Sequence, residues 1–151
     1  MDQPFFYETR ADWLLCDPNH HMRNSAFLDV SVHCRMRFFE ESGFPVEEFE
    51  RRRIGPVIRS DHVDYRREVR HLDPIRIELW LDGASPRMSR FRFRNVVLRD
   101  GGESIAAVIT TEAGWLDLSA RKLINPPDDL VALMQGIQRT PEFENLPESV
   151  R

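Results

Sequence analysis

The strongest constraint on the fold is a change in the spacing of the apolar residues midway along the chain. Residues 27–38 carry apolar side chains at helical spacing, between N-cap candidates at Asn24 and Ser25 and a stop signal at Gly43. Further on, apolar and polar residues alternate, most clearly over 75–82. One long helix followed by alternating strands predicts an α+β protein with an antiparallel sheet wrapped around the central helix.

The same patterns place the other elements and the domain boundary. We expect one domain over residues 1–139, followed by a loose, polar C-terminal tail over 140–151. Strands are expected over about 5–15, 57–69, 75–82, 90–97 and 105–115, with short helices over 46–49 and 126–137.

The hairpin around Gly83 has a predicted register. Pairing Leu79 with Phe91 keeps the apolar side chains on one face and sets Glu78 opposite Arg92. A slip of one residue would turn the arginines toward the core, so the hydrophobic pattern favours this pairing.

Composition and charge exclude several classes of protein. The net charge of −4 gives no reason to expect nucleic-acid binding, and no apolar run approaches the length of a membrane span. Cys16 and Cys34 occur without a secretory leader, which favours reduced thiols in a cytoplasmic protein. Cys34 lies on the apolar stripe of the helix, as a core thiol would.

The stretch from Asp17 to Phe27 brings together a carboxylate, a polar turn and the predicted helix start within eleven residues. Helix N-termini favour anionic oxygens, because unpaired N–H groups and the positive end of the dipole meet there. This arrangement can aim an acid at a carbonyl group whose oxygen rests on helix amides. It therefore suggests a small acyl-transfer site.

With these residues the chain resembles the hotdog-fold acyl-CoA thioesterases of the 4-hydroxybenzoyl-CoA thioesterase-like family. Their common motif, Asp-x-x-Gly-His-Val-Asn-Asn, is matched here by Asp17, His21 and Asn24, with Phe27 where an aromatic residue is usual. The resemblance covers roughly residues 5–118 and includes three further features: Tyr65, the turn at 71–73 and the late hairpin at 100–103.

Two residues depart from the motif. His20 replaces the glycine, and Arg23 replaces the first asparagine of the pair. Glycine permits a positive φ or a close ligand approach, and histidine is expected to make both harder. The turn, or the width of the pocket, is where we expect this chain to differ from the family.

The resemblance implies hydrolysis of an acyl thioester to a free acid and CoA, without a metal or redox cofactor. Asp17 would act as the nucleophile or as the general base for water, and both routes remain open. The backbone N–H of Asn24 would stabilise the oxyanion. The residues expected to bind the substrate are His21, Arg23, Ser25 and Arg66. For the two arginines the reason is that guanidinium pairs well with the phosphates of CoA.

Each candidate also has a purely structural interpretation. Asp17 could be an Asx-turn residue before Pro18, and Asn24 could be a plain N-cap. His20 and His21 are adjacent and lack a second cluster at zinc-like spacing, so no metal site is predicted.

Other functions and assemblies remain open from the sequence. The alternative to catalysis is a non-catalytic hotdog module that binds acyl-CoA, and a hotdog hydratase or dehydratase fits less well. The acyl carrier is CoA or a carrier protein. A homodimer or a dimer of dimers is expected, because one helix covers only one face of the sheet.

Overall fold

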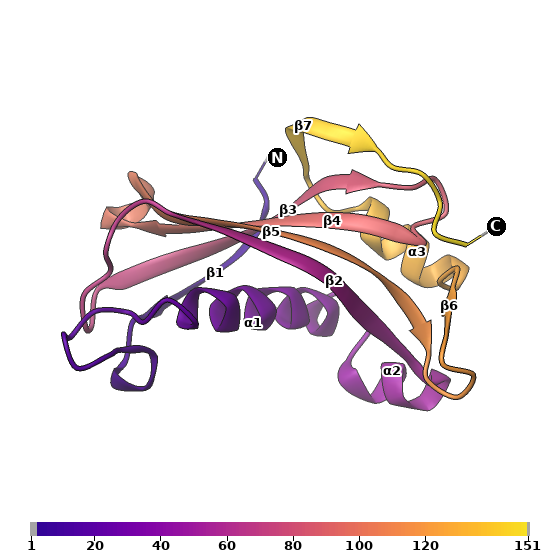
Figure 1. The fold of residues 1–151 in the computed structure, drawn as a ribbon, viewed down its shortest axis with the longest axis horizontal. Helices are drawn as coiled ribbons and strands as arrows, with labels where there is room; N and C mark the ends of the chain where they lie inside the picture. The colour runs from indigo at the N-terminus through magenta and orange to yellow at the C-terminus, as the bar shows by residue number, and fades with distance from the viewer. Residues whose placement is uncertain (1–2, 151) are drawn as a thin grey trace.

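The structure is a computed structural model that describes residues 3–150. Its elements are shown in Figure 1. In chain order they are β1 (Phe5–Arg10), the 3₁₀ helix η1 (Trp13–Leu15), α1 (Ala26–Glu41), α2 (Val46–Arg52), β2 (Ile54–Tyr65), β3 (Pro74–Ala84), β4 (Arg90–Arg99), the 3₁₀ turn η2 (Asp100–Gly102), β5 (Ser104–Asp117), β6 (Lys122–Ile124), α3 (Asp128–Gln135) and β7 (Arg139–Asn145).

Within the described residues, seven strands form one sheet, and five of them lie in the order β1-β3-β4-β5-β2. β6 pairs with the end of β5, and β7 pairs in parallel with β3. The long helix α1 lies against one face of the sheet, and α3 and β7 lie on the other side near one end (Figure 1). The expected α+β arrangement is confirmed. Over residues 3–150, the structure contains no helix long and apolar enough to cross a membrane.

The core forms where α1 and α2 meet the sheet. α1 buries the predicted apolar stripe, including Phe27, Val30 and Cys34. Trp115 of β5 is fully buried, and its ring centroid lies 5.3 Å from that of Phe91 and within about 6 Å of two further phenylalanine rings. Burying aromatic rings of this size contributes much of the hydrophobic stabilisation of the domain.

The hairpin between β3 and β4 does not have the predicted register. Leu79 lies opposite Asn95 rather than Phe91, and the expected pairing of Glu78 with Arg92 is lost with it. The prediction was wrong because β3 continues through a bulge to its end at residue 84, which moves the turn to 85–89. A shift of four residues preserves the alternation, so the same side chains still face the core.

The chain from residue 140 onward is not the loose tail that we expected. Thr140 is buried, and its Oγ1 donates a 2.7 Å hydrogen bond to Asp82 Oδ1. Leu146 is also buried, and its N–H donates to the carbonyl of Ala84. β7 escaped prediction because it covers a charged face of the sheet and so carries few apolar residues of its own.

Other elements end at different residues than predicted, because of local hydrogen bonds. The first strand ends at Arg10, because Asp12 Oδ1 accepts the N–H of Leu14 and starts the 3₁₀ turn. β2 ends at Tyr65, after which the N–H groups of Arg66 and Arg67 both donate to the carbonyl of Ala106. β6 had no counterpart among the expected strands.

Candidate active site

Asp17 organises the turn that precedes α1. Its Oδ1 accepts hydrogen bonds from the N–H of Asn19 at 2.9 Å and of His21 at 3.4 Å. The backbone N–H of Asp17 donates to the carbonyl of His21 at 2.8 Å. Asp17 is therefore an Asx-turn residue, as one of the two interpretations predicted. Its second carboxylate oxygen, Oδ2, accepts no hydrogen bond from the residues that the structure describes.

His20 has a backbone conformation that favours glycine. Its φ of 64° lies in the left-handed region, which costs a residue with a Cβ about 1–2 kcal/mol. The imidazole ring lies against Trp13, with 5.7 Å between the ring centroids. The turn is thus formed with a histidine at this position.

Backbone pairing fixes the turn to the end of the sheet. The N–H of Met22 donates to the carbonyl of Val69 at 2.7 Å, and the N–H of His71 donates to the carbonyl of His20 at 2.8 Å. Between these bonds, the Nε2 of His21 lies 3.4 Å from the Glu68 carboxylate. The segment 20–22 therefore runs beside 69–71 as a short strand-like pair.

The start of α1 faces the same region. Tyr65 donates a 3.0 Å hydrogen bond from its hydroxyl to the carbonyl of Asn24, and its ring packs edge-on against Phe27. Among residues 3–150, the N–H groups of Asn24, Ser25 and Phe27 donate no hydrogen bond. Free amides at a helix N-terminus attract an anionic oxygen.

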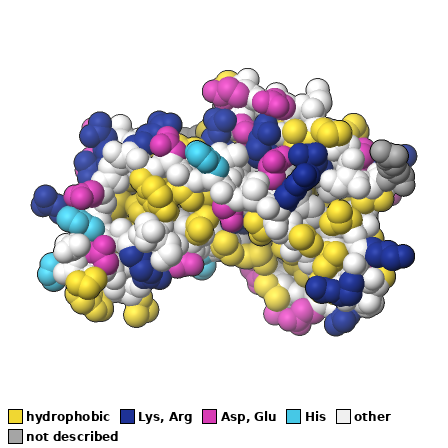
Figure 2. Space-filling view, in the orientation of Figure 1, with side chains coloured by type: hydrophobic (Ala, Val, Ile, Leu, Met, Phe, Trp, Pro, Cys, Tyr) yellow, Lys and Arg dark blue, Asp and Glu magenta, His cyan; other side chains and the backbone are white. Residues whose placement is uncertain are grey.

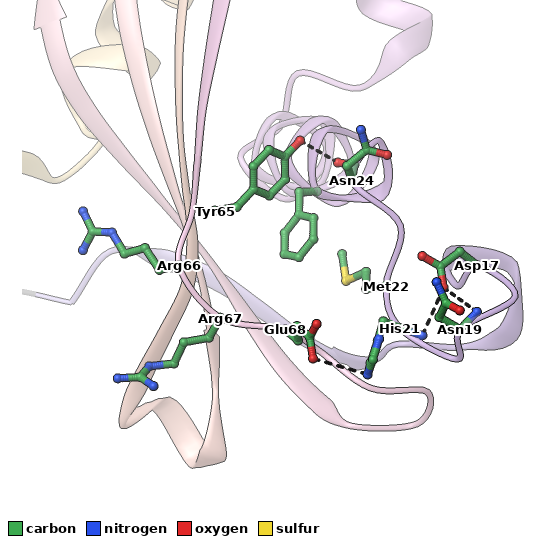
Figure 3. A pocket seen from close by; sticks show the side chains of 10 residues that line it. Asp17, Asn19, His21, Met22, Asn24, Tyr65, Arg66, Arg67 and Glu68 are labelled. Atoms are coloured by element: carbon green, nitrogen blue, oxygen red, sulfur yellow. Dashed lines mark hydrogen bonds and ion pairs between the residues drawn. The ribbon is translucent and has the colours of Figure 1, made fainter.

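The turn, the start of α1 and the end of β2 line a pocket of about 380 Å³ that is open to solvent. Figure 3 shows Asp17, Met22 and Tyr65 around it, while Arg66 and Arg67 extend on the other side of the strand end from Tyr65. The wall is formed by Asp17, Asn19, His21, Met22, Asn24, Phe27, Tyr65, Arg66, Arg67 and Glu68.

Four of the predicted site residues, Asp17, His21, Asn24 and Arg66, lie on the wall of this pocket. Glu68 was not anticipated, because the predicted strand over 57–69 assigned it to regular alternation. The strand ends earlier, and the run of charged residues after Tyr65 was the signal for that break.

Arg23 and Ser25 are not part of the pocket wall. The guanidinium of Arg23 is held by neighbours in the sequence: its Nε donates to Ser25 Oγ at 3.0 Å, and another of its nitrogens lies 3.0 Å from Asp29 Oδ2. A further hydrogen bond joins Arg23 to the carbonyl of Leu14. These local acceptors draw both side chains away from the space beside Asp17.

The adjacent histidines have different partners. His20 packs on Trp13, whereas His21 faces Glu68. In the part of the chain that the structure describes, no group of three metal-ligating side chains could hold an ion.

A family model for the thioesterase-like superfamily matches residues 10–134. The chain belongs to the thioesterase-like superfamily. The match confirms the resemblance and the expected class of enzyme, a thioester hydrolase. A search of curated proteins finds no match to this member of the superfamily.

Solved structures with low sequence identity share the fold of this superfamily member. A Staphylococcus aureus protein in complex with CoA superposes with a TM-score of 0.83 at 16% identity, covering 97% of this chain and 90% of that one. A 1,4-dihydroxy-2-naphthoyl-CoA thioesterase from Synechocystis gives a TM-score of 0.79 at 14% identity, with 90% and 98% covered. An Aquifex aeolicus protein gives 0.78 at 18% identity, with 86% and 98% covered. The expected hotdog fold is confirmed.

Proposed function

We propose that this protein is an acyl-CoA thioesterase that hydrolyses an acyl thioester to a free acid and CoA. The observation that carries the proposal is the placement of Asp17 and the unbonded amides of the α1 start on one pocket wall. The family match and the CoA-containing neighbour from Staphylococcus aureus support the choice of thioester and carrier.

The reaction would use the two oxygens of Asp17 differently. Oδ1 holds the turn, and Oδ2 is available for chemistry. As a nucleophile, Oδ2 would attack the thioester carbon, expel the CoA thiolate and leave a mixed anhydride for water to hydrolyse. As a general base, it would take a proton from the attacking water and pass it to the leaving thiolate. In both routes the N–H of Asn24 would stabilise the negative oxygen of the tetrahedral intermediate.

Arg66 and Arg67 are suited to bind the phosphates of CoA next to the pocket, on the side of the strand end to which their side chains extend (Figure 3). Both side chains also line a neighbouring depression with Glu103 and Ser104. Arg66 already pairs with Asp64 at 2.8 Å, but both partners are half exposed, so a phosphate can compete for the guanidinium. His21, near the thioester position, would contact the pantetheine end.

We further infer that the chain forms a single domain, which includes β7. We also infer that it self-associates as a homodimer or a dimer of dimers. β2 is an edge strand of twelve residues whose outer side has no partner strand among the described residues. Val32 of α1 and Ile58 of β2 are each about half exposed. Figure 2 shows, in the orientation of Figure 1, hydrophobic side chains gathered on the surface among charges of both signs. A long, exposed edge of this kind favours pairing with a second copy.

A purely binding role has less support than catalysis. Its main argument was the disturbance that His20 and Arg23 were expected to cause in the turn. His20 adopts the left-handed conformation that the turn requires, and Arg23 lies outside the pocket wall. Neither departure removes a group that the hydrolysis needs.

The test is thiol release from a panel of short, long and aromatic acyl-CoAs. Asp17→Asn should lower kcat/KM by about 10²–10⁴-fold, the usual contribution of a catalytic base. Asp12→Asn is the matched control, since Asp12 also accepts the N–H of the residue two positions later but lies outside the pocket. Activity that survives in Asp17→Asn, or a wild-type protein that releases no thiol from any substrate, would contradict the proposal.

Rapid-quench mass spectrometry separates the two routes. If Asp17 is the nucleophile, the acyl group is found during turnover on the peptide that contains Asp17. If Asp17 is a general base, no acylated enzyme forms.

A further inference from the structure

A second cavity, of about 140 Å³, lies between α1 and the sheet, separate from the pocket beside Asp17. Apart from one arginine, its lining is apolar. It is formed by Val32, Arg35, Met36, Phe39, Pro56, Ile58, Phe91, Phe93, Ala113 and Trp115.

Arg35 is the unusual member of this lining. It is only 6% exposed, and its Nη1 atom is buried without a hydrogen-bond partner. Within residues 3–150 the guanidinium forms no salt bridge, and burial lowers its pKa. The carboxylate of Asp61 in β2 attracts the Arg35 guanidinium electrostatically, but its Oδ1 accepts a 2.6 Å hydrogen bond from Thr111. A buried charge without a partner is costly, so the cavity is complementary to a ligand that supplies an anion.

The cavity dimensions limit what that ligand can be. A dry apolar cavity of about 150 Å³ accommodates a molecule the size of benzene. The space beside Arg35 therefore fits the end of an acyl group rather than a nucleotide. A guanidinium binds a carboxylate through two parallel hydrogen bonds, which a neutral methyl terminus cannot replace.

The cavity and the Asp17 pocket lie along the same seam between α1 and β2. The pocket is lined by residues at the start of α1 and the end of β2. The cavity is lined by later residues of α1 and by residues at the start of β2 (Figure 1). Arg35 follows Asn24 by eleven residues, about 16 Å along a helix axis. An extended acyl group can bridge much of this separation, and the arginine side chain contributes further reach.

We propose that Arg35 sets substrate specificity by binding a carboxylate at the end of the acyl group remote from the thioester. The preferred substrates are then CoA monothioesters of dicarboxylic acids. This inference rests on the proposed thioesterase function and adds the class of acyl group that the enzyme takes.

Matched substrate pairs test the proposal. Adipoyl-, suberoyl- and dodecanedioyl-CoA are compared with hexanoyl-, octanoyl- and dodecanoyl-CoA, which have the same number of carbons. In the wild-type protein at least one dicarboxylic substrate should have a kcat/KM about tenfold higher than its partner, or more. Arg35→Met should reduce this ratio to about one or below, because methionine fills the space without a charge.

Arg37→Met is the matched control on the same helix. Arg37 is exposed, pairs with Glu41 at 3.1 Å and does not line the cavity, so its replacement should leave the ratio unchanged. Calorimetric titration with free suberate and its uncharged diamide provides a second measurement that needs no turnover. The wild-type protein should bind suberate more tightly than the diamide, and Arg35→Met should lose that difference.

The outcomes distinguish the failure of each proposal. If no thioester is hydrolysed but suberate binding depends on Arg35, the thioesterase proposal fails and the carboxylate site stands. If thiol is released with no preference for dicarboxylic substrates, or Arg35→Met keeps the preference, Arg35 is not a specificity residue. If Arg35→Met and Asp61→Asn both weaken self-association in sedimentation and leave the substrate ratio unchanged, Arg35 pairs with a second copy and the proposal is overturned.

Discussion

Replacing Asp82 by alanine should destabilise the protein far more than removing an exposed carboxylate. Asp82 is 4% exposed and lies under β7. Its Oδ2 accepts a hydrogen bond from Arg92 Nε at 2.9 Å, while Arg94 and Thr140 each approach Oδ1 to 2.7 Å. One buried carboxylate therefore neutralises two arginines and holds the C-terminal strand.

The expected magnitude follows from what the substitution leaves behind. Removing one partner of a buried ion pair costs about 3–5 kcal/mol, because the remaining charge stays buried. Arg92 and Arg94 retain Glu144 at 3.5 Å and Glu142 at 3.2 Å, and these exposed carboxylates recover part of the loss. We expect a decrease of about 3 kcal/mol in the free energy of unfolding, or about 6–12 °C in Tm for a chain of this length.

Urea unfolding followed by tryptophan fluorescence measures the effect. Asp64→Ala is the control, because Asp64 pairs with Arg66 at a similar 2.8 Å but both side chains are 49% exposed. An exposed pair contributes less than about 1 kcal/mol. Equal losses for Asp82→Ala and Asp64→Ala would refute the reasoning, since burial is the difference that it depends on.

Three other substitutions or titrations check separate features. His20→Gly should change the free energy of unfolding by less than about 1 kcal/mol and keep activity. Glycine relieves the left-handed strain but adds conformational entropy to the unfolded chain, and the two effects offset each other. Urea unfolding measures the change, and a large loss of stability would contradict this. Burial raises the pKa of Cys34 to about 12, so iodoacetamide at pH 8 should label it only after unfolding, as mass spectrometry would show. Hydrogen bonds from Arg51 and Arg52 lower the pKa of Glu48 to about 2. Its contribution to stability is therefore complete above its unfolded pKa of about 4.3 and is lost as pH falls toward 2, and NMR titration should find the low midpoint.

The hydrophobic pattern determined which face each strand buries but not which residues pair. Registers of the β3–β4 hairpin that differ by four residues bury the same side chains, so alternation cannot choose between them. The choice lies in the bulge after Leu81 and in the turn at 85–89, which depend on local backbone geometry. β7 could not be predicted for a related reason: Thr140 and Glu142 pair with Asp82 and Arg94, whose positions are known only once the sheet has formed.

Only part of the candidate site could be predicted from the sequence. Asp17, His21 and Asn24 are close in sequence, and a turn followed by a helix start is enough to group them. The hydroxyl of Tyr65 reaches Asn24 across forty-one residues, and the family resemblance pointed to that tyrosine where the residues alone did not. Arg35 did leave a signal, because it interrupts the apolar stripe of α1 three residues after Val32. That its guanidinium forms no salt bridge within residues 3–150 could only be seen in the folded chain.

The backbone anchoring of the turn before α1 has a consequence for how this enzyme can change over evolutionary time. Main-chain bonds at Met22 and His71 hold the segment to the sheet, and these bonds do not depend on side-chain identity. Positions 18 and 19 can therefore accept new side chains while the carboxylate of Asp17 stays where it is. A lineage could alter the entrance to the pocket by successive substitutions there, with each intermediate still active, which makes this short segment a natural place to diversify a library.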